Sequence, residues 1–101
     1  MKIQWSERAL KDLDHVFQFY LELASFEVAQ KVTGKLASKV RILESYSELG
    51  VVEKFDVILP FEYRSLIEGD FKIIYRFILE DKMILIARIF DTRRDPKKKI
   101  I

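Results

Sequence analysis

The chain of 101 residues contains no cysteine, a single histidine and no long apolar run. Without cysteine it can form neither disulfide bonds nor thiolate zinc sites, and it carries no thiol nucleophile. His15 alone cannot build a histidine metal cluster, so we expect no metal site and no cofactor. No segment approaches the roughly 20 apolar residues of a membrane span, and "MKIQWSERAL" lacks the apolar core of a signal peptide. These absences predict a soluble cytoplasmic protein that does not bind membranes.

Hydrophobic residues are abundant. They make up 50% of the chain, and 13% of it is aromatic, which predicts a folded globular protein. A chain of this length can bury one core but not two, so we expect a single domain over residues 1–101. The formal net charge is only +2. This balance neither requires nor excludes an anionic partner.

The first half of the chain shows helical periodicity behind a short strand-like segment, "MKIQW". Ser6 and Ser25 each precede a run in which apolar residues recur at helical spacing. They predict helices over about residues 7–23 and 25–46, capped by the two serines and packed as an antiparallel hairpin. Gly34 lies inside the second helix at a cost of about 1 kcal/mol, which suggests a close approach to another part of the chain, with the first helix as the candidate.

Lysine recurs along the second predicted helix. Lys31, Lys35 and Lys39 lie four residues apart on its polar side. We interpret this row as a solvated face, because lysine-rich surfaces are normal for helical bundles, with a binding stripe as the alternative.

Beyond a connecting loop predicted over Val51–Pro60, the apolar period changes from 3.6 residues to 2. The new period predicts three consecutive antiparallel strands, ending near Phe90. The expected fold class is therefore α+β. An N-terminal strand precedes an antiparallel helical hairpin that packs on one face of a three- to four-stranded antiparallel sheet.

The turn at Gly69 and Asp70 sets the register of the first hairpin. Glycine supplies the positive φ that a two-residue turn needs, and this turn places Arg64 opposite Tyr75. We expect Arg64 and Tyr75 to stabilise the fold through a buried hydrogen bond rather than to contact a target.

A three-residue second turn would place Ile74 opposite Arg88 and Tyr75 opposite Ala87. We prefer this register because it collects apolar residues on the face that the helices cover. The other face then mixes isoleucines with cations, which is too apolar for ordinary solvated surface and fits an amphipathic acidic peptide. The residues of this face that we expect to bind a partner are Ile74, Arg76, Ile84, Ile86, Arg88 and Phe90.

Three segments of the chain, "WSERALKDL", "YRSLIEGDFKIIYRF" and "ILIARIFDTRRDP", resemble the RelE/ParE superfamily of toxins. These toxins belong to bacterial type II toxin-antitoxin systems, which stabilise plasmids. The resemblance covers nearly the whole chain and implies the fold described above. It also implies a partner, a small antitoxin whose C-terminal segment wraps the toxin and silences it.

Two activities divide this superfamily, and the resemblance bears on both. RelE-type members cut messenger RNA on the ribosome, whereas ParE-type members poison DNA gyrase by contact. Lys72 stands where the ribonucleases carry a catalytic arginine and Arg93 matches their later arginine, so these two are the candidates for toxic activity. Tyr63 and Ser65, however, replace two expected lysines, and Asp91 stands where many relatives carry histidine.

An ionised aspartate is a poor neighbour for a phosphate. We therefore predict a toxin closer to ParE than to RelE, acting on gyrase by contact rather than as an enzyme, with no small-molecule substrate. The alternatives are a ribosome-dependent mRNA endonuclease and a non-toxic interaction module that binds an acidic peptide. The lysines behind Pro96, from Lys97 to Lys99, are expected to form a solvated tail.

Overall fold

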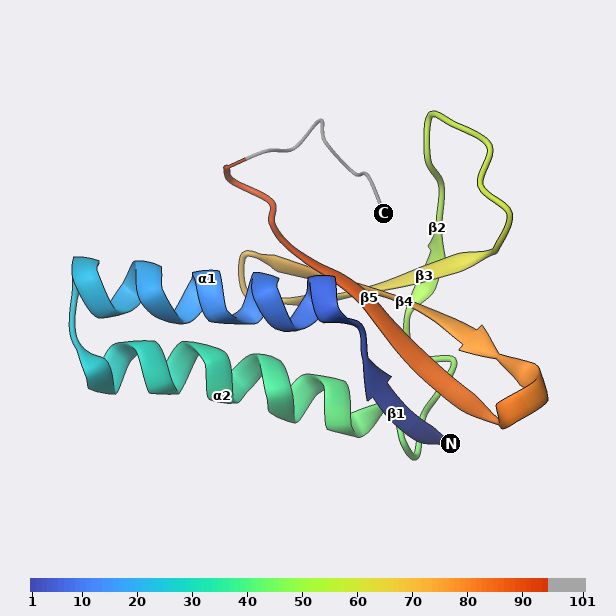
Figure 1. Cartoon of the computed structure of the whole chain (residues 1–101), viewed down its shortest axis with the longest axis horizontal. Coiled ribbons are helices and arrows are strands. Elements are labelled where there is room, and N and C mark those ends of the chain that lie inside the picture. Colours follow the sequence, from blue (N-terminus) through green and yellow to red (C-terminus); the bar gives the residue numbers. More distant parts are fainter. Residues whose placement is uncertain (95–101) are drawn as a thin grey trace.

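The computed structural model describes residues 1–94, in which two helices lie side by side next to a five-stranded sheet (Figure 1). The tail predicted behind Pro96 lies outside the described residues. In chain order the elements are β1 (Lys2–Trp5), α1 (Glu7–Leu23), α2 (Phe26–Ile42), β2 (Val51–Glu53), β3 (Tyr63–Glu68), β4 (Phe71–Ile78), the 3-10 helix η1 (Leu79–Asp81) and β5 (Met83–Asp91).

Both helices begin at the predicted serine caps. The Ser6 hydroxyl accepts a hydrogen bond from the backbone N–H of Ala9 at 3.0 Å, and the Ser25 hydroxyl accepts one from Val28 at 3.1 Å. Each serine thereby satisfies one of the N–H groups that a helix start leaves without a partner. The predicted helical hairpin is confirmed.

The second helix differs from its prediction in two respects. It ends at Ile42, about four residues earlier than expected. Gly34 is exposed, and a Cβ atom built on it would meet no heavy atom within 4 Å. The predicted close packing of Gly34 against the first helix is therefore wrong, and no contact within the fold offsets its helix-breaking tendency.

The sheet has the order β1-β5-β4-β3-β2. β1 runs parallel to β5, and the other neighbours are antiparallel. The α+β class is confirmed, but the sheet has five strands, one more than the upper end of the predicted three to four. The additional strand is β2 (Val51–Glu53), which lies at the start of the predicted loop and pairs with β3.

The two turns of the sheet differ in how well the sequence predicted them. The first turn places Arg64 opposite Tyr75, as predicted. The second runs over residues 79–82, one residue longer than predicted, and includes η1 and a left-handed Lys82 with φ 49°.

The longer turn shifts the pairing of β4 with β5 and moves two isoleucines to the other face. Tyr75 now lies opposite Ile86, and a bulge between Ile74 and Tyr75 restores the predicted pairing of Ile74 with Arg88. Because a one-residue shift turns a side chain to the opposite face, Ile84 and Ile86 point into the helix-covered core, where both are fully buried. Their placement on the partner-binding face was therefore wrong.

The main core lies between the helical hairpin and one face of the sheet. Its buried residues are Ala9, Leu36, Val40, Leu43, Leu66, Phe71, Ile73, Tyr75, Ile84, Ile86 and Ile89.

A second, smaller cluster lies on the other face of the sheet. The loop between β2 and β3 supplies Phe55 and Leu59, which pack with three buried strand residues and with Phe90. The three buried strand residues are Tyr63, Ile74 and Ala87. The sheet face that was predicted to be uncovered is thus partly covered by the chain's own loop, over residues 54–62.

Candidate functional site

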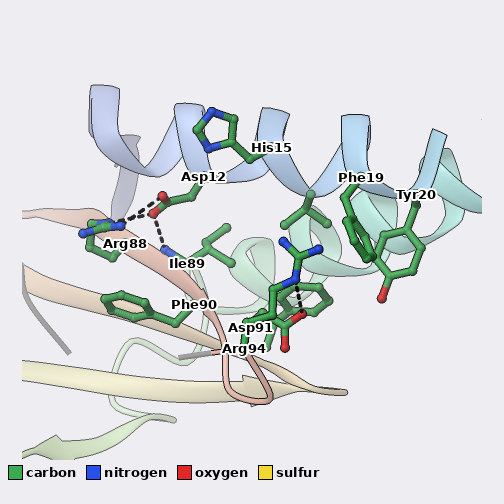
Figure 2. A pocket seen from close by; sticks show the side chains of 11 residues that line it. Asp12, His15, Phe19, Tyr20, Arg88, Ile89, Phe90, Asp91 and Arg94 are labelled. Carbon is green, nitrogen blue, oxygen red and sulfur yellow. Dashed lines mark hydrogen bonds and ion pairs between the residues drawn. The ribbon is translucent and has the colours of Figure 1, made fainter. Parts of the chain in front are cut away.

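A cleft of about 360 Å³ lies between α1 and the end of β5 (Figure 2). Its lining mixes aromatic side chains with charged ones. The lining residues are Asp12, His15, Val16, Phe19, Tyr20, Phe71, Arg88, Ile89, Phe90, Asp91 and Arg94.

The cleft exists because α1 takes the place of β1 beside β5. The backbone N–H of Ser6 donates to the carbonyl of Ile86 at 3.0 Å, and the Ser6 hydroxyl donates to the carbonyl of Ala87 at 3.0 Å. Beyond this point the chain is helical and cannot continue the strand ladder. On the edge of β5 that pairs with β1, the end of the strand therefore faces side chains of α1 instead of a neighbouring strand.

Asp12 of α1 occupies that open strand edge. Its carboxylate accepts a hydrogen bond from the backbone N–H of Ile89 at 2.9 Å and one from Nε of Arg88 at 2.7 Å. Figure 2 shows both bonds meeting at the Asp12 carboxylate. The Asp12 carboxylate thus satisfies a backbone N–H at the strand edge and also forms an ion pair with Arg88. The side chains of Asp12 and Arg88 are only 14% and 16% exposed.

Arg93 follows β5 and joins three other groups. Its guanidinium lies 3.2 Å from the carboxylate of Asp91 and 3.3 Å from that of Asp70. It also donates to the hydroxyl of Tyr20 at 3.1 Å, and its backbone N–H donates to Asp91. This network fixes the segment after β5 against both α1 and the β3–β4 turn.

The charges of this network shift two pKa values. Burial is the largest influence on Asp91 and raises its pKa, but the two hydrogen bonds from Arg93 and the charges of Arg93 and Arg94 outweigh it. The pKa of Asp91 therefore lies below its ordinary value of 3.8. The hydrogen bond to Asp91, followed by that to Tyr20, raises the pKa of Arg93. Asp91 and Arg93 are therefore both charged at neutral pH, and each stabilises the charged form of the other.

Arg94 forms one wall of the cleft. Its guanidinium carbon lies 3.7 Å from the ring centroid of Phe19, and its Nε lies 4.0 Å from the carboxylate of Asp91. The side chain is 55% exposed, so a partner entering the cleft would meet both the cation and the aromatic ring.

Lys72 lies elsewhere, on β4. Its Nζ is 2.6 Å from Oε1 of Glu53 on β2, and the two side chains are 18% and 9% exposed. Glu53 also accepts a hydrogen bond from the Ser65 hydroxyl at 3.2 Å. Neither Lys72 nor Arg93 lines the cleft, so the structure does not bring the two candidates for toxic activity into that pocket.

A family model described as "ParE toxin of type II toxin-antitoxin system, parDE" matches residues 3–96. The chain belongs to the ParE toxin family. It is also similar to a solved structure titled "Chromosomal ParDE TA system from P. aeruginosa", with 28% sequence identity and a TM-score of 0.74 over 90% of this chain and 95% of that chain. No curated protein matches the chain. The predicted resemblance is confirmed, and it is to the ParE type. The chain is a toxin of a type II toxin-antitoxin system.

The residues predicted to bind a partner are divided among three places in this ParE toxin. Arg88 and Phe90 line the cleft, with the guanidinium carbon of Arg88 4.7 Å from the Phe90 ring centroid. Arg76 stacks on Phe61 of the β2–β3 loop, 3.8 Å from its ring centroid. The other three are fully buried: Ile74, Ile84 and Ile86.

Sequence reasoning missed four residues of the cleft in this ParE toxin. Phe19, Tyr20 and Arg94 form its wall, and Asp12 holds Arg88. The segment "FQFY", with three aromatic residues in four positions, signals an apolar surface wider than one helical stripe. Nothing comparable marks Asp12, whose partner is 76 residues away in the sequence.

Arg64 and Tyr75 lie outside the cleft and hold the segment after α2. The Tyr75 hydroxyl accepts from the N–H of Gly50 and donates to the carbonyl of Ser47, each at 2.9 Å. Arg64 donates to the carbonyl of Gly50 at 2.8 Å. Burial raises the pKa of Tyr75, against the lowering effect of the Gly50 hydrogen bond. A Cβ on Gly50 would lie 2.7 Å from the Tyr75 ring, so this contact requires glycine.

Residues 1–94 show neither a metal cluster nor a membrane-spanning helix. No group of three or more histidine, aspartate or glutamate side chains is arranged to hold a metal ion there. Neither described helix has the length and apolar character needed to cross a membrane.

Proposed function

We propose that this ParE-family toxin inhibits DNA gyrase by protein contact and that a cognate antitoxin silences it. Gyrase works on DNA in the bacterial cytoplasm, which is where we place the toxin. The observation that carries the choice of mechanism is the pairing of Lys72 with Glu53 and of Arg93 with Asp91.

Cleavage of RNA would need these two cations for a different task. The reaction requires a base to activate the 2′-hydroxyl and cations that hold the phosphate while negative charge builds up. A carboxylate beside each cation repels a phosphate, and Lys72 would first have to leave a partner that is only 9% exposed. Inhibition by contact makes no such demand, because it needs a complementary surface and no reacting group.

The cleft between α1 and β5 is the site we propose for the antitoxin. It combines aromatic rings from Phe19 and Phe90 with the exposed cation of Arg94. An amphipathic segment with apolar and acidic side chains complements such a surface, since the rings of the cleft can bury apolar groups while Arg94 pairs with a carboxylate. The predicted partner residues Arg88 and Phe90 belong to this cleft, whereas Arg76 lies outside it.

Two assays run side by side test the proposed activity. The purified toxin is added to gyrase with relaxed plasmid, and separately to ribosomes carrying messenger RNA. We expect loss of supercoiling in the first assay and intact messenger in the second. Cut messenger with normal supercoiling would establish the ribonuclease alternative, and no effect in either assay would favour an interaction module without toxicity.

A further inference from the structure

The exposed side of α2 carries a concentration of positive charge that the proposed function does not use. Between Val28 and Leu43 the chain contains four cations and no acidic residue. We call lysine face the set formed by Gln30, Lys31, Lys35, Ser38 and Lys39.

The three lysines of this face are aligned and unpaired. They recur every four residues, so their Cα atoms lie about 6 Å apart along the helix axis and span about 12 Å. Lys31 and Lys35 are exposed and Lys39 is half-buried. Within residues 1–94, none of the three has a carboxylate within 4 Å. The lysine face differs in this respect from the cleft, where Arg88 is held by Asp12.

A shallow groove of about 470 Å³ runs beside these lysines. Gly34 and Ser38 form part of its lining, and the space above Gly34 is open. Glu68 supplies the one carboxylate among the residues that line this groove, against three ammonium groups. The groove is therefore positive, and a ligand can approach the helix closely at its centre.

The chemistry of the lining distinguishes two kinds of anionic partner. Protein interfaces are rich in aromatic residues and arginine and poor in lysine, and no aromatic residue lines this groove. Contacts to nucleic-acid phosphates are made by lysine together with serine and glutamine, which is the composition of the lysine face. One strand of duplex DNA carries a phosphate about every 3.4 Å of helix axis, so three lysines over about 12 Å can each reach one.

We propose that the lysine face of α2 binds the phosphate backbone of duplex DNA without reading its sequence. This contact is independent of the cleft between α1 and β5 and of the proposed inhibition of gyrase. It would bring the toxin to DNA, the substrate of its proposed target, through weak contacts that dissociate readily.

Fluorescence anisotropy with a short labelled duplex of arbitrary sequence measures this binding on the full chain. Three phosphate contacts predict a slope of about −2.7 for the logarithm of the association constant against the logarithm of the salt concentration. Between about 50 and 200 mM salt, affinity should therefore fall about 40-fold.

Two matched triple variants locate the contact. The first replaces the three lysines of the lysine face: Lys31→Gln, Lys35→Gln and Lys39→Gln. The second removes the same number of charges from exposed lysines on other segments: Lys11→Gln, Lys54→Gln and Lys82→Gln. Glutamine keeps the helix propensity of lysine, and circular dichroism checks that both variants fold. We expect the first variant to lose DNA binding and its salt slope, while the second stays within about twofold of the parent chain.

Several results would overturn the proposal. They are failure of the parent chain to bind at about 50 mM salt, unchanged binding by the first variant, or an equal loss in both variants. If the first variant kept its affinity for DNA but lost affinity for an acidic protein such as the antitoxin, the lysine face would be a protein-binding surface instead. Gyrase inhibition by the parent chain is scored separately, so failure of DNA binding leaves the proposed function untouched.

Discussion

Tyr75 links β4 to the segment after α2 through two hydrogen bonds, one accepted from Gly50 and one donated to Ser47. Gly50 is buried, and the tyrosine ring packs directly against it. The single hydroxyl therefore satisfies one donor and one acceptor inside the fold.

Replacing Tyr75 by phenylalanine removes that hydroxyl, so the N–H of Gly50 and the carbonyl of Ser47 lose their hydrogen-bond partner. We expect the free energy of unfolding to fall by about 1–3 kcal/mol, because buried polar groups lose their partners while the ring is kept. Urea denaturation measures the loss. Tyr46→Phe is the matched control, since Tyr46 is 66% exposed and should tolerate the change. Equal stability of both variants would show that the Tyr75 hydroxyl is not needed.

Asp91 makes stability depend on pH. Its pKa is lower in the folded chain than the ordinary 3.8, so the stability it contributes is present above that value and is lost as pH falls through the folded pKa. Asp91→Asn should therefore be less stable than the parent chain at pH 7, and the difference should shrink below about pH 4. The urea midpoints of the two chains, compared at pH 7 and again below about pH 4, measure this difference in stability. Asp14→Asn at an exposed position is the control. A difference that stays constant with pH would contradict the role of the Asp91 charge.

At the scale of secondary-structure elements, the sequence predicted what local patterns determine. Serine caps and helical periodicity predicted α1 and α2, and the glycine turn fixed the pairing of Arg64 with Tyr75. The second turn has no glycine, and Lys82 adopts the left-handed conformation there. Its extra residue moved Ile84 and Ile86 to the core face, which no local pattern reveals.

The cover of the second sheet face was equally beyond local patterns. Phe55 and Leu59 lie in a segment without periodicity, and they join a cluster with Ile74, about fifteen to twenty positions away in the sequence. A buried Ile74 is part of this smaller cluster, so it is not an exposed anchor for a partner. The cleft between α1 and β5 likewise depends on where β1 ends and α1 begins beside β5, which only the three-dimensional arrangement shows.

The proposed antitoxin site is tested at the cleft wall. Arg94→Ala removes an exposed cation that stacks on Phe19, and we expect affinity for the antitoxin to fall about tenfold, equivalent to about 1.4 kcal/mol. Isothermal titration with the purified antitoxin measures the change. Arg8→Ala removes an equal charge from an exposed position of α1 and should leave affinity unchanged. Equal effects of both variants would mean that overall charge, and not the cleft, governs binding.

For the whole molecule, the distribution of paired and unpaired charge separates three surfaces. Lys72 and Arg93 are held closely by carboxylates. The cleft combines rings with Arg94, which is 55% exposed and lies 4.0 Å from Asp91, and the three lysines of the lysine face are unpaired within residues 1–94. The ion pairs of Lys72 and Arg93 support a toxin in which these two cations do not bind the phosphate of RNA. Because Lys72 is only 18% exposed and is held by Glu53, we expect a toxin that acts by contact to stay active when the Lys72 charge is lost.

A gyrase supercoiling assay on a variant with both Glu53→Gln and Lys72→Met tests that expectation most directly. The two substitutions replace a largely buried ion pair by neutral side chains of similar length, which folded proteins often tolerate, and the introduced amide oxygen can still accept the hydrogen bond from Ser65. We predict that the parent chain and the double variant inhibit supercoiling at the same concentration. The proposed mechanism would be contradicted if the parent chain left gyrase active, or if inhibition disappeared in a double variant that is still folded.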